Sequence, residues 1–117
     1  MPMRIRGTIT FKGAIADISG AVVFVRIIDV SRADAAACTL SEYRVSLSSR
    51  TDTSTKIPFE LDVNIIDTRR SYTITAHVDL DGDGKISVGD YITMQSFPVR
   101  GDSLSPYYLV EVRRVEG

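Results

Sequence analysis

Cysteine, tryptophan and histidine are scarce in this 117-residue chain, which has one Cys, no Trp and one His. A single cysteine cannot form an internal disulfide, so the hydrophobic core must hold the fold by itself. Long apolar runs are also missing, because the longest, residues 21–25, is ended by Arg26. A membrane-spanning helix requires about 20 predominantly apolar residues. We therefore predict no membrane span.

An excess of charge of either sign is missing as well. The chain has 14 Lys and Arg against 15 Asp and Glu, a formal net charge of −1. Nucleic-acid-binding proteins carry a basic patch or stripe, so we predict no nucleic-acid partner. With 44% hydrophobic and 25% charged residues, the composition is that of a soluble globular protein. The length predicts a single domain, residues 1–117, and leaves the oligomeric state open.

The N-terminal residues lead directly into an alternating segment, without the apolar stretch of a signal peptide. We therefore expect a cytoplasmic protein, or an envelope or periplasmic protein if a leader has been removed.

Segments in which apolar and polar residues alternate with period two recur from one end of the chain to the other, which predicts an all-β fold. Seven short strands separated by turn signals favour a single seven-stranded antiparallel β-sandwich, of the Greek-key kind seen in Ig and prealbumin domains. The predicted strands are residues 3–11, 21–30, 43–47, 57–63, 72–78, 91–97 and 107–115. The predicted core consists of Ile9, Val23, Val25, Ile27, Phe59, Leu61, Ile74 and Val110.

Two residues within these strands carry more specific expectations. Gly7 marks a bulge or the close approach of another segment. Pro58 cannot donate to a ladder, so we expect its strand to lie at an edge or to start there.

One segment, residues 79–90, carries specific chemistry, with the sequence DLDGDGKISVGD. In the 12-residue calcium loop, acidic ligands stand at positions 1, 3, 5 and 12, and a glycine at position 6 makes the sharp turn. Gly84 takes position 6 here, and the segment resembles the calcium loops of EF-hands and, more closely, those of dockerin-like modules. The pattern predicts a structural Ca²⁺ site whose ligands are Asp79, Asp81, Asp83, the Lys85 carbonyl, Ser87 and Asp90.

Two features distinguish this loop from an EF-hand. Its flanks are β-patterned instead of helical, and Asp90 at position 12 reaches less readily than Glu toward bidentate coordination, so we expect a dissociation constant of about 10⁻⁵ to 10⁻³ M. Ile86 at position 8 is expected to pack under the loop. The alternative interpretation is an acidic hairpin connection, in which Asp-Gly pairs supply turns with positive φ. It explains Gly82 and Gly84 but does not require Asp79 or Asp90.

Catalytic constellations are not visible in the sequence. His77 is the only histidine, and its parity predicts that it lies on the outer face of its strand. No nucleophile elbow, zinc-ligand spacing or phosphate-binding glycine loop accompanies it. We therefore predict that the protein is not an enzyme.

Four segments together resemble a known family. They are residues 6–9 (RGTI), 25–35 (VRIIDVSRADA), 57–61 (IPFEL) and 72–78 (YTITAHV). The pattern is similar to that of the YbaY/YscW-type small lipoproteins, the type III secretion lipoprotein chaperones or pilotins. The resemblance implies a compact β-sandwich, no catalytic residues, and a protein partner such as a secretin or another envelope protein.

Two hypotheses for function follow. The first is a non-enzymatic, pilotin-like binding or chaperone module with a calcium loop at residues 79–90. The second is a calcium-stabilised structural or adhesion-type accessory domain with no chaperone role. A partner could also be recruited by addition of a strand to an unpaired sheet edge, but the sequence does not locate that edge.

Overall fold

The computed structural model describes residues 3–13, 18, 20–30, 38–47, 56–63, 71–99 and 107–116. The secondary structure in these ranges consists of eight strands, which confirms the all-β prediction. Within the same ranges, no helix is long and apolar enough to cross a bilayer. The strands are β1 (Met3–Phe11), β2 (Val22–Asp29), β3 (Cys38–Ser46), β4 (Lys56–Val63), β5 (Tyr72–Asp79), β6 (Tyr91–Ile92), β7 (Pro98–Val99) and β8 (Tyr107–Arg114).

The prediction of seven strands is wrong because the segment expected at residues 91–97 does not form one strand. β6 and β7 both pair with β5, and residues 93–97 run between them. Side chains interrupt the backbone ladder there: the Ala76 N–H donates to Thr93 Oγ1 at 3.3 Å, and the Phe97 N–H donates to Thr73 Oγ1 at 2.9 Å. The strand expected at residues 43–47 instead begins at Cys38, because Thr39 and Cys38 continue the pairing with β2.

The prediction of a purely antiparallel sandwich is also wrong. The strand order is β3-β2-β5-β6-β8-β1-β4, with β7 beside β5, and β1 and β8 are parallel. A short hairpin imposes antiparallel pairing on the strands that it joins. β1 and β8 are the first and last strands of the chain, so no hairpin constrains their relative direction.

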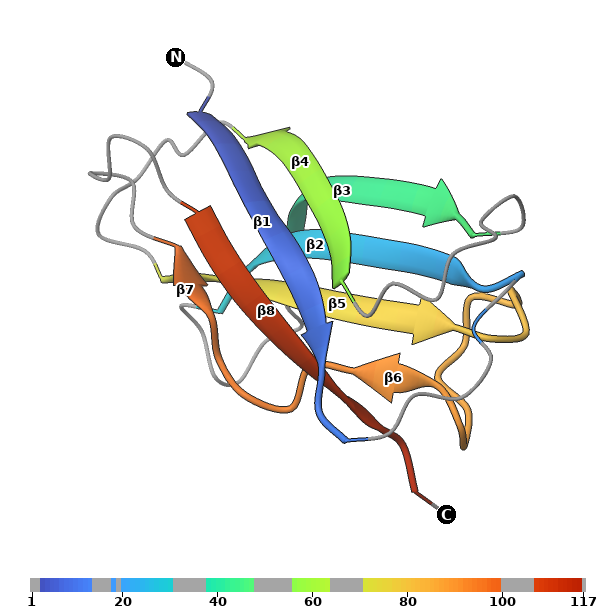
Figure 1. Ribbon diagram of the computed structural model, residues 1–117. Coiled ribbons are helices and arrows are strands. Elements are labelled where there is room, and N and C mark those ends of the chain that lie inside the picture. The colour runs from blue at the N-terminus through green and yellow to red at the C-terminus, as the bar shows by residue number, and fades with distance from the viewer. Residues whose placement is uncertain are drawn as a thin grey trace.

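The sheet bends into two layers that nearly close into a barrel. In Figure 1, β1, β4 and β8 form one layer and cross over β2, β3 and β5. β8 joins the layers, because Tyr107–Val112 pair with β1 while Arg113 and Arg114 pair with β6. The two ends of the strand order, β3 and β4, meet where Ser41 Oγ donates to Asp62 O at 2.6 Å. No backbone ladder joins these two strands in the described part of the chain, so the barrel remains open at this seam.

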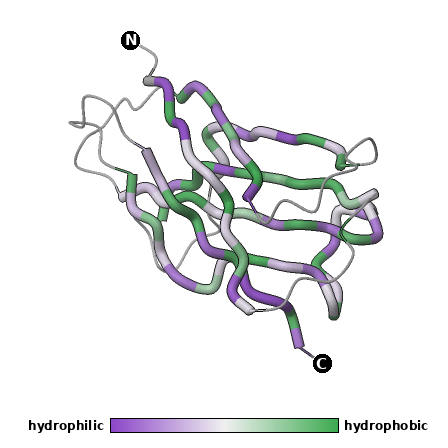
Figure 2. The backbone as a smooth tube through the Cα atoms, in the orientation of Figure 1, coloured by the Kyte–Doolittle hydropathy of each residue, from purple (hydrophilic) through white to green (hydrophobic). Residues whose placement is uncertain are grey.

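The interior between the layers is filled by side chains of alternate residues on the long strands, which point inward. Figure 2 shows hydrophilic and hydrophobic residues alternating along them. All eight predicted core residues are buried, and Ile5, Ile57, Val78, Tyr91 and Val112 join them. The prediction for Pro58 is confirmed, since β4 ends the strand order.

Gly7 provides the close approach that its position predicted. A Cβ placed there would collide with the carbonyl oxygen of Tyr108 and with the Phe59 ring. Glycine at this position therefore allows β8 to pair beside β1 while Phe59 fills the core.

Candidate functional site

The acidic segment connects β5 to β6, and its two ends are fixed by the sheet. Asp79 is the last residue of β5, and Asp90 immediately precedes β6. Between them, Gly82, Gly84 and Gly89 adopt φ values of 70°, 79° and 97°. This is the left-handed region that glycine occupies without steric cost. The sharp turn predicted at Gly84 is therefore present, and so are the turns with positive φ that an acidic hairpin connection requires.

Asp79 is fully buried and its carboxylate folds back over the loop. Its Oδ1 accepts a hydrogen bond from the Gly82 N–H at 3.0 Å, and its Oδ2 accepts one from the Gly84 N–H at 2.7 Å. The two bonds hold the first turn of the loop against the end of β5. Each carboxylate oxygen offers about two acceptor sites, so both oxygens of Asp79 retain capacity for another ligand.

Asp90 is also buried and closes the loop from its other end. Its Oδ1 accepts from the Leu80 N–H at 3.1 Å, and its Oδ2 accepts from the Ser87 N–H at 3.1 Å. His77 Nε2 lies 2.8 Å from the same Oδ2. Burial raises the pKa of the Asp90 carboxyl, but the hydrogen bonds from His77, Leu80 and Ser87 outweigh burial and hold the pKa below its ordinary value. The carboxylate is therefore ionised at neutral pH.

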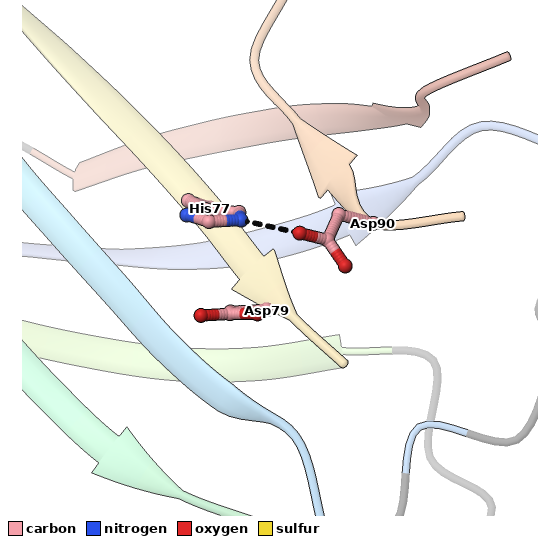
Figure 3. A group of neighbouring side chains, drawn as sticks. All are labelled: His77, Asp79 and Asp90. Atoms are coloured by element: carbon pink, nitrogen blue, oxygen red, sulfur yellow. Dashed lines mark hydrogen bonds and ion pairs between the residues drawn. The ribbon is translucent and has the colours of Figure 1, made fainter. Parts of the chain in front are cut away.

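His77 is the member of this site that sequence reasoning missed. It lies on the outer side of β5, as its parity predicted, but it is buried. The Phe24 ring of β2 stacks on it with centroids 5.9 Å apart. Ligand atoms of His77, Asp79 and Asp90 lie within 4.8 Å of one another, and Figure 3 shows the three side chains gathered at the end of β5. The available signal was the His77–Asp79 spacing, because residues two apart on a strand share a face.

The other predicted ligands do not join this buried group. Asp81, Asp83 and Lys85 are exposed, and Ser87 is half-buried. Asp83 Oδ1 accepts from the Lys85 N–H at 2.9 Å, a local turn contact. The structure therefore brings together Asp79 and Asp90 of the six predicted ligands, and adds His77. Ile86 does not pack under the loop as expected, since it is 60% exposed.

The arrangement is a buried polar site whose carboxylates accept hydrogen bonds from the backbone of the loop itself. Burying an ionised carboxylate is costly unless hydrogen bonds or an opposite charge compensate. Backbone N–H groups and His77 supply such bonds to Asp79 and Asp90. Two buried carboxylates this close together also favour a cation, and carboxylate oxygens are the ligands that Ca²⁺ prefers.

Comparisons with known proteins bear on the whole chain. The model of the family YscW, described as type III secretion system lipoprotein chaperone, matches residues 2–100. A solved structure of an alternative pilotin from the type II secretion system of Vibrio cholerae is similar in fold. Its TM-score is 0.79 at 23% sequence identity, and the alignment covers 100% of both chains. Among curated proteins, none matches the chain.

Proposed function

Because this chain belongs to the YscW family of type III secretion system lipoprotein chaperones, we propose that it is a pilotin-like chaperone that binds a secretin subunit. The observation that carries the proposal is the extent of the family match. Residues 2–100 span β1 to β7 and include the acidic loop. The family consists of chaperones, not enzymes, in agreement with the sequence prediction.

A partner surface is available on the outer face of β1 and β8. Tyr107 and Leu109 share one face of β8 and are 62% and 64% exposed. Thr8 lies opposite Leu109 in the register, and its hydroxyl shares a hydrogen bond with that of Tyr107. Beside them, Arg6 forms an exposed ion pair with Glu60 at 3.2 Å. An apolar centre with a charged rim is the usual anatomy of a protein interface.

Binding to the secretin encoded in the same genome tests this proposal. We expect the purified chain to co-elute with the secretin in size-exclusion chromatography and to bind it in calorimetry. Leu109→Ser should weaken binding by about tenfold or more, because burying a leucine side chain against a partner contributes about 1.5–3 kcal/mol. Met94→Ser is the matched control, since Met94 is 53% exposed but lies in the loop between β6 and β7. Absence of secretin binding by the wild-type chain would refute the chaperone role.

We propose further that residues 79–90 bind Ca²⁺ as a structural ion. The support is the convergence of Asp79 and Asp90, both buried, together with the positive φ of Gly82 and Gly84. Asp81 and Asp83 are exposed on the same loop and would turn inward to coordinate the ion. The Lys85 carbonyl and Ser87 would complete a shell of hard oxygen ligands, as Ca²⁺ requires.

Calcium titration of chelator-stripped protein, with a thermal melt alongside, tests the ion site. At about 100 times the dissociation constant, Ca²⁺ should add about 2.7 kcal/mol to the free energy of unfolding and raise the melting temperature. Asp81→Asn should abolish this rise without changing the melt in chelator, because Asp81 is exposed. Asp62→Asn, which changes an exposed carboxylate of β4, should leave the rise intact. A flat titration at millimolar calcium would leave the loop as an acidic turn.

The two experiments also separate the two hypotheses derived from the sequence. A calcium-stabilised accessory domain with no chaperone role would give the calcium response but no secretin binding.

A further inference from the structure

The open edge of β3 is a surface that the proposed chaperone role does not use. β3 pairs on one side with β2, and no strand in the described ranges pairs with its other side. Ser41 near its start contacts β4, whereas the arrowhead of β3 extends beyond β4 in Figure 1. An unpaired edge presents a row of backbone donors and acceptors, which is a template for another strand.

Of the two ends of the strand order, β4 contains a proline that blocks such pairing and β3 does not. β4 carries Pro58 and the exposed charged residues Lys56, Glu60 and Asp62, the devices that usually block edge pairing. In β3, the register with β2 shifts between Ile27 and Ile28. The first three residues of β3 are therefore out of register with the rest of the strand. The regular part, residues 41–46, contains no Pro, Gly or Lys.

The exposed side chains on this edge have opposite charges two residues apart. Glu42 and Arg44 are both exposed and share the outer face of β3. Glu42 Oε2 lies 2.6 Å from Arg26 Nε. The Arg44 guanidinium lies 5.3 Å from the centroid of the Phe24 ring, and no described carboxylate forms an ion pair with it.

We propose that a second copy of this chain occupies the edge, with the two β3 strands antiparallel about a two-fold axis at Tyr43. In this register Glu42 faces Arg44 of the partner subunit, and the symmetry repeats the pair. Residues directly opposite each other in an antiparallel pair point to the same face of the sheet. The two-fold axis must therefore lie between the two copies of one residue. Axes at Glu42 or Arg44 would place like charges opposite each other, which is destabilising. The Tyr43 register is the one near the strand centre that makes both cross-strand pairs attractive.

Sedimentation equilibrium over about a hundred-fold range of concentration tests the dimer. The wild-type chain should show a monomer–dimer equilibrium. Arg44→Glu and Glu42→Arg should each weaken self-association by about tenfold or more, because two attractive pairs become repulsive. An equimolar mixture of the two variants should recover a dimer, since opposite charges then face each other across the axis. Arg114→Glu is the matched control, because it reverses an exposed Arg of β8 and should leave the dimer unchanged.

Hydrogen exchange of the wild-type chain at low and high concentration gives a reading that needs no variant. The backbone amides of β3 that face away from β2, those of Glu42 and Arg44 among them, should become protected as the dimer forms, whereas those of Tyr43 and Val45 already bond to β2. A chain that stays monomeric throughout, or protection confined to other strands, would overturn the proposal. So would self-association that neither variant weakens, or a mixture that fails to recover the dimer. None of these results depends on whether the chain binds a secretin or Ca²⁺.

Discussion

At the scale of single residues, Asp90 is the loop carboxylate whose replacement should most lower the free energy of unfolding of the calcium-free protein. Asp90→Asn preserves the shape but removes the negative charge that three donors approach. We expect the free energy of unfolding at pH 7 to fall by about 2–4 kcal/mol, because buried charge-assisted hydrogen bonds are lost. The folded-state pKa of Asp90 lies below its ordinary value. This stabilisation is therefore complete above the unfolded pKa of about 3.9 and disappears as the pH falls through the folded pKa.

Urea denaturation with chelator, at pH 7 and at pH values below about 4, measures this difference. The gap between wild type and Asp90→Asn should shrink as the pH falls. Asp83→Asn serves as the control, because Asp83 is exposed, and should change the free energy of unfolding by less than about 0.5 kcal/mol. An Asp90→Asn gap of equal size at both ends of the pH range would show that ionisation of Asp90 is not its source.

At the scale of elements, the junction of β1, β4 and β8 depends on the missing side chain of Gly7. In Gly7→Ala the new Cβ meets the Tyr108 carbonyl oxygen and the Phe59 ring. The ring can shift, but the backbone of β8 cannot move without disturbing the parallel pairing. We expect a loss of about 3 kcal/mol in the free energy of unfolding, the upper end of the typical range for overpacked core sites, because the new contacts would be shorter than 3.0 Å. Gly13→Ala, which meets no atom within 4 Å but has a φ of 84°, should lose only about 1–2 kcal/mol, the cost of left-handed backbone for a residue with a Cβ. Equal losses in the two variants, measured by urea denaturation, would contradict the collision.

The sequence predicted which residues of a strand face inward, because this depends on local alternation. It did not predict features that depend on pairing with strands distant in the chain. Ile9, Val25, Phe59 and Ile74 lie inward as their parity requires. Alternation also continues from Ile92 to Gln95, although the Thr93 hydroxyl replaces a ladder partner there, so alternation did not show that β6 ends at Ile92. In the loop, glycine and aspartate spacing predicted the turns. The burial of His77 depends on Phe24, a neighbour contributed by another strand, and a local motif cannot show it.

At the scale of the whole molecule, closure depends on β8, and the family match ends before that strand begins. Alternation predicted a strand there but could not show that it pairs in parallel with β1 and then antiparallel with β6. The same strand buries Val110 and Val112 completely. Without it, the layers would be joined neither at β1 nor at β6, and the inward faces of both would be exposed.

Removing residues 107–117 should therefore abolish cooperative unfolding, although the family-matched region remains intact. Each buried valine contributes about 1.5–3 kcal/mol by apolar burial alone, and the ladders to β1 and β6 are lost with them. This is comparable with the whole stability of a small domain, about 5–15 kcal/mol. Calorimetry of the shortened chain should show no transition, and a synthetic peptide of residues 107–117 should restore it by re-forming both ladders. Removing residues 116–117 alone, beyond the last strand, should change the transition little. A cooperative melt of the chain without β8 would mean that the remaining strands close the core by a different pairing.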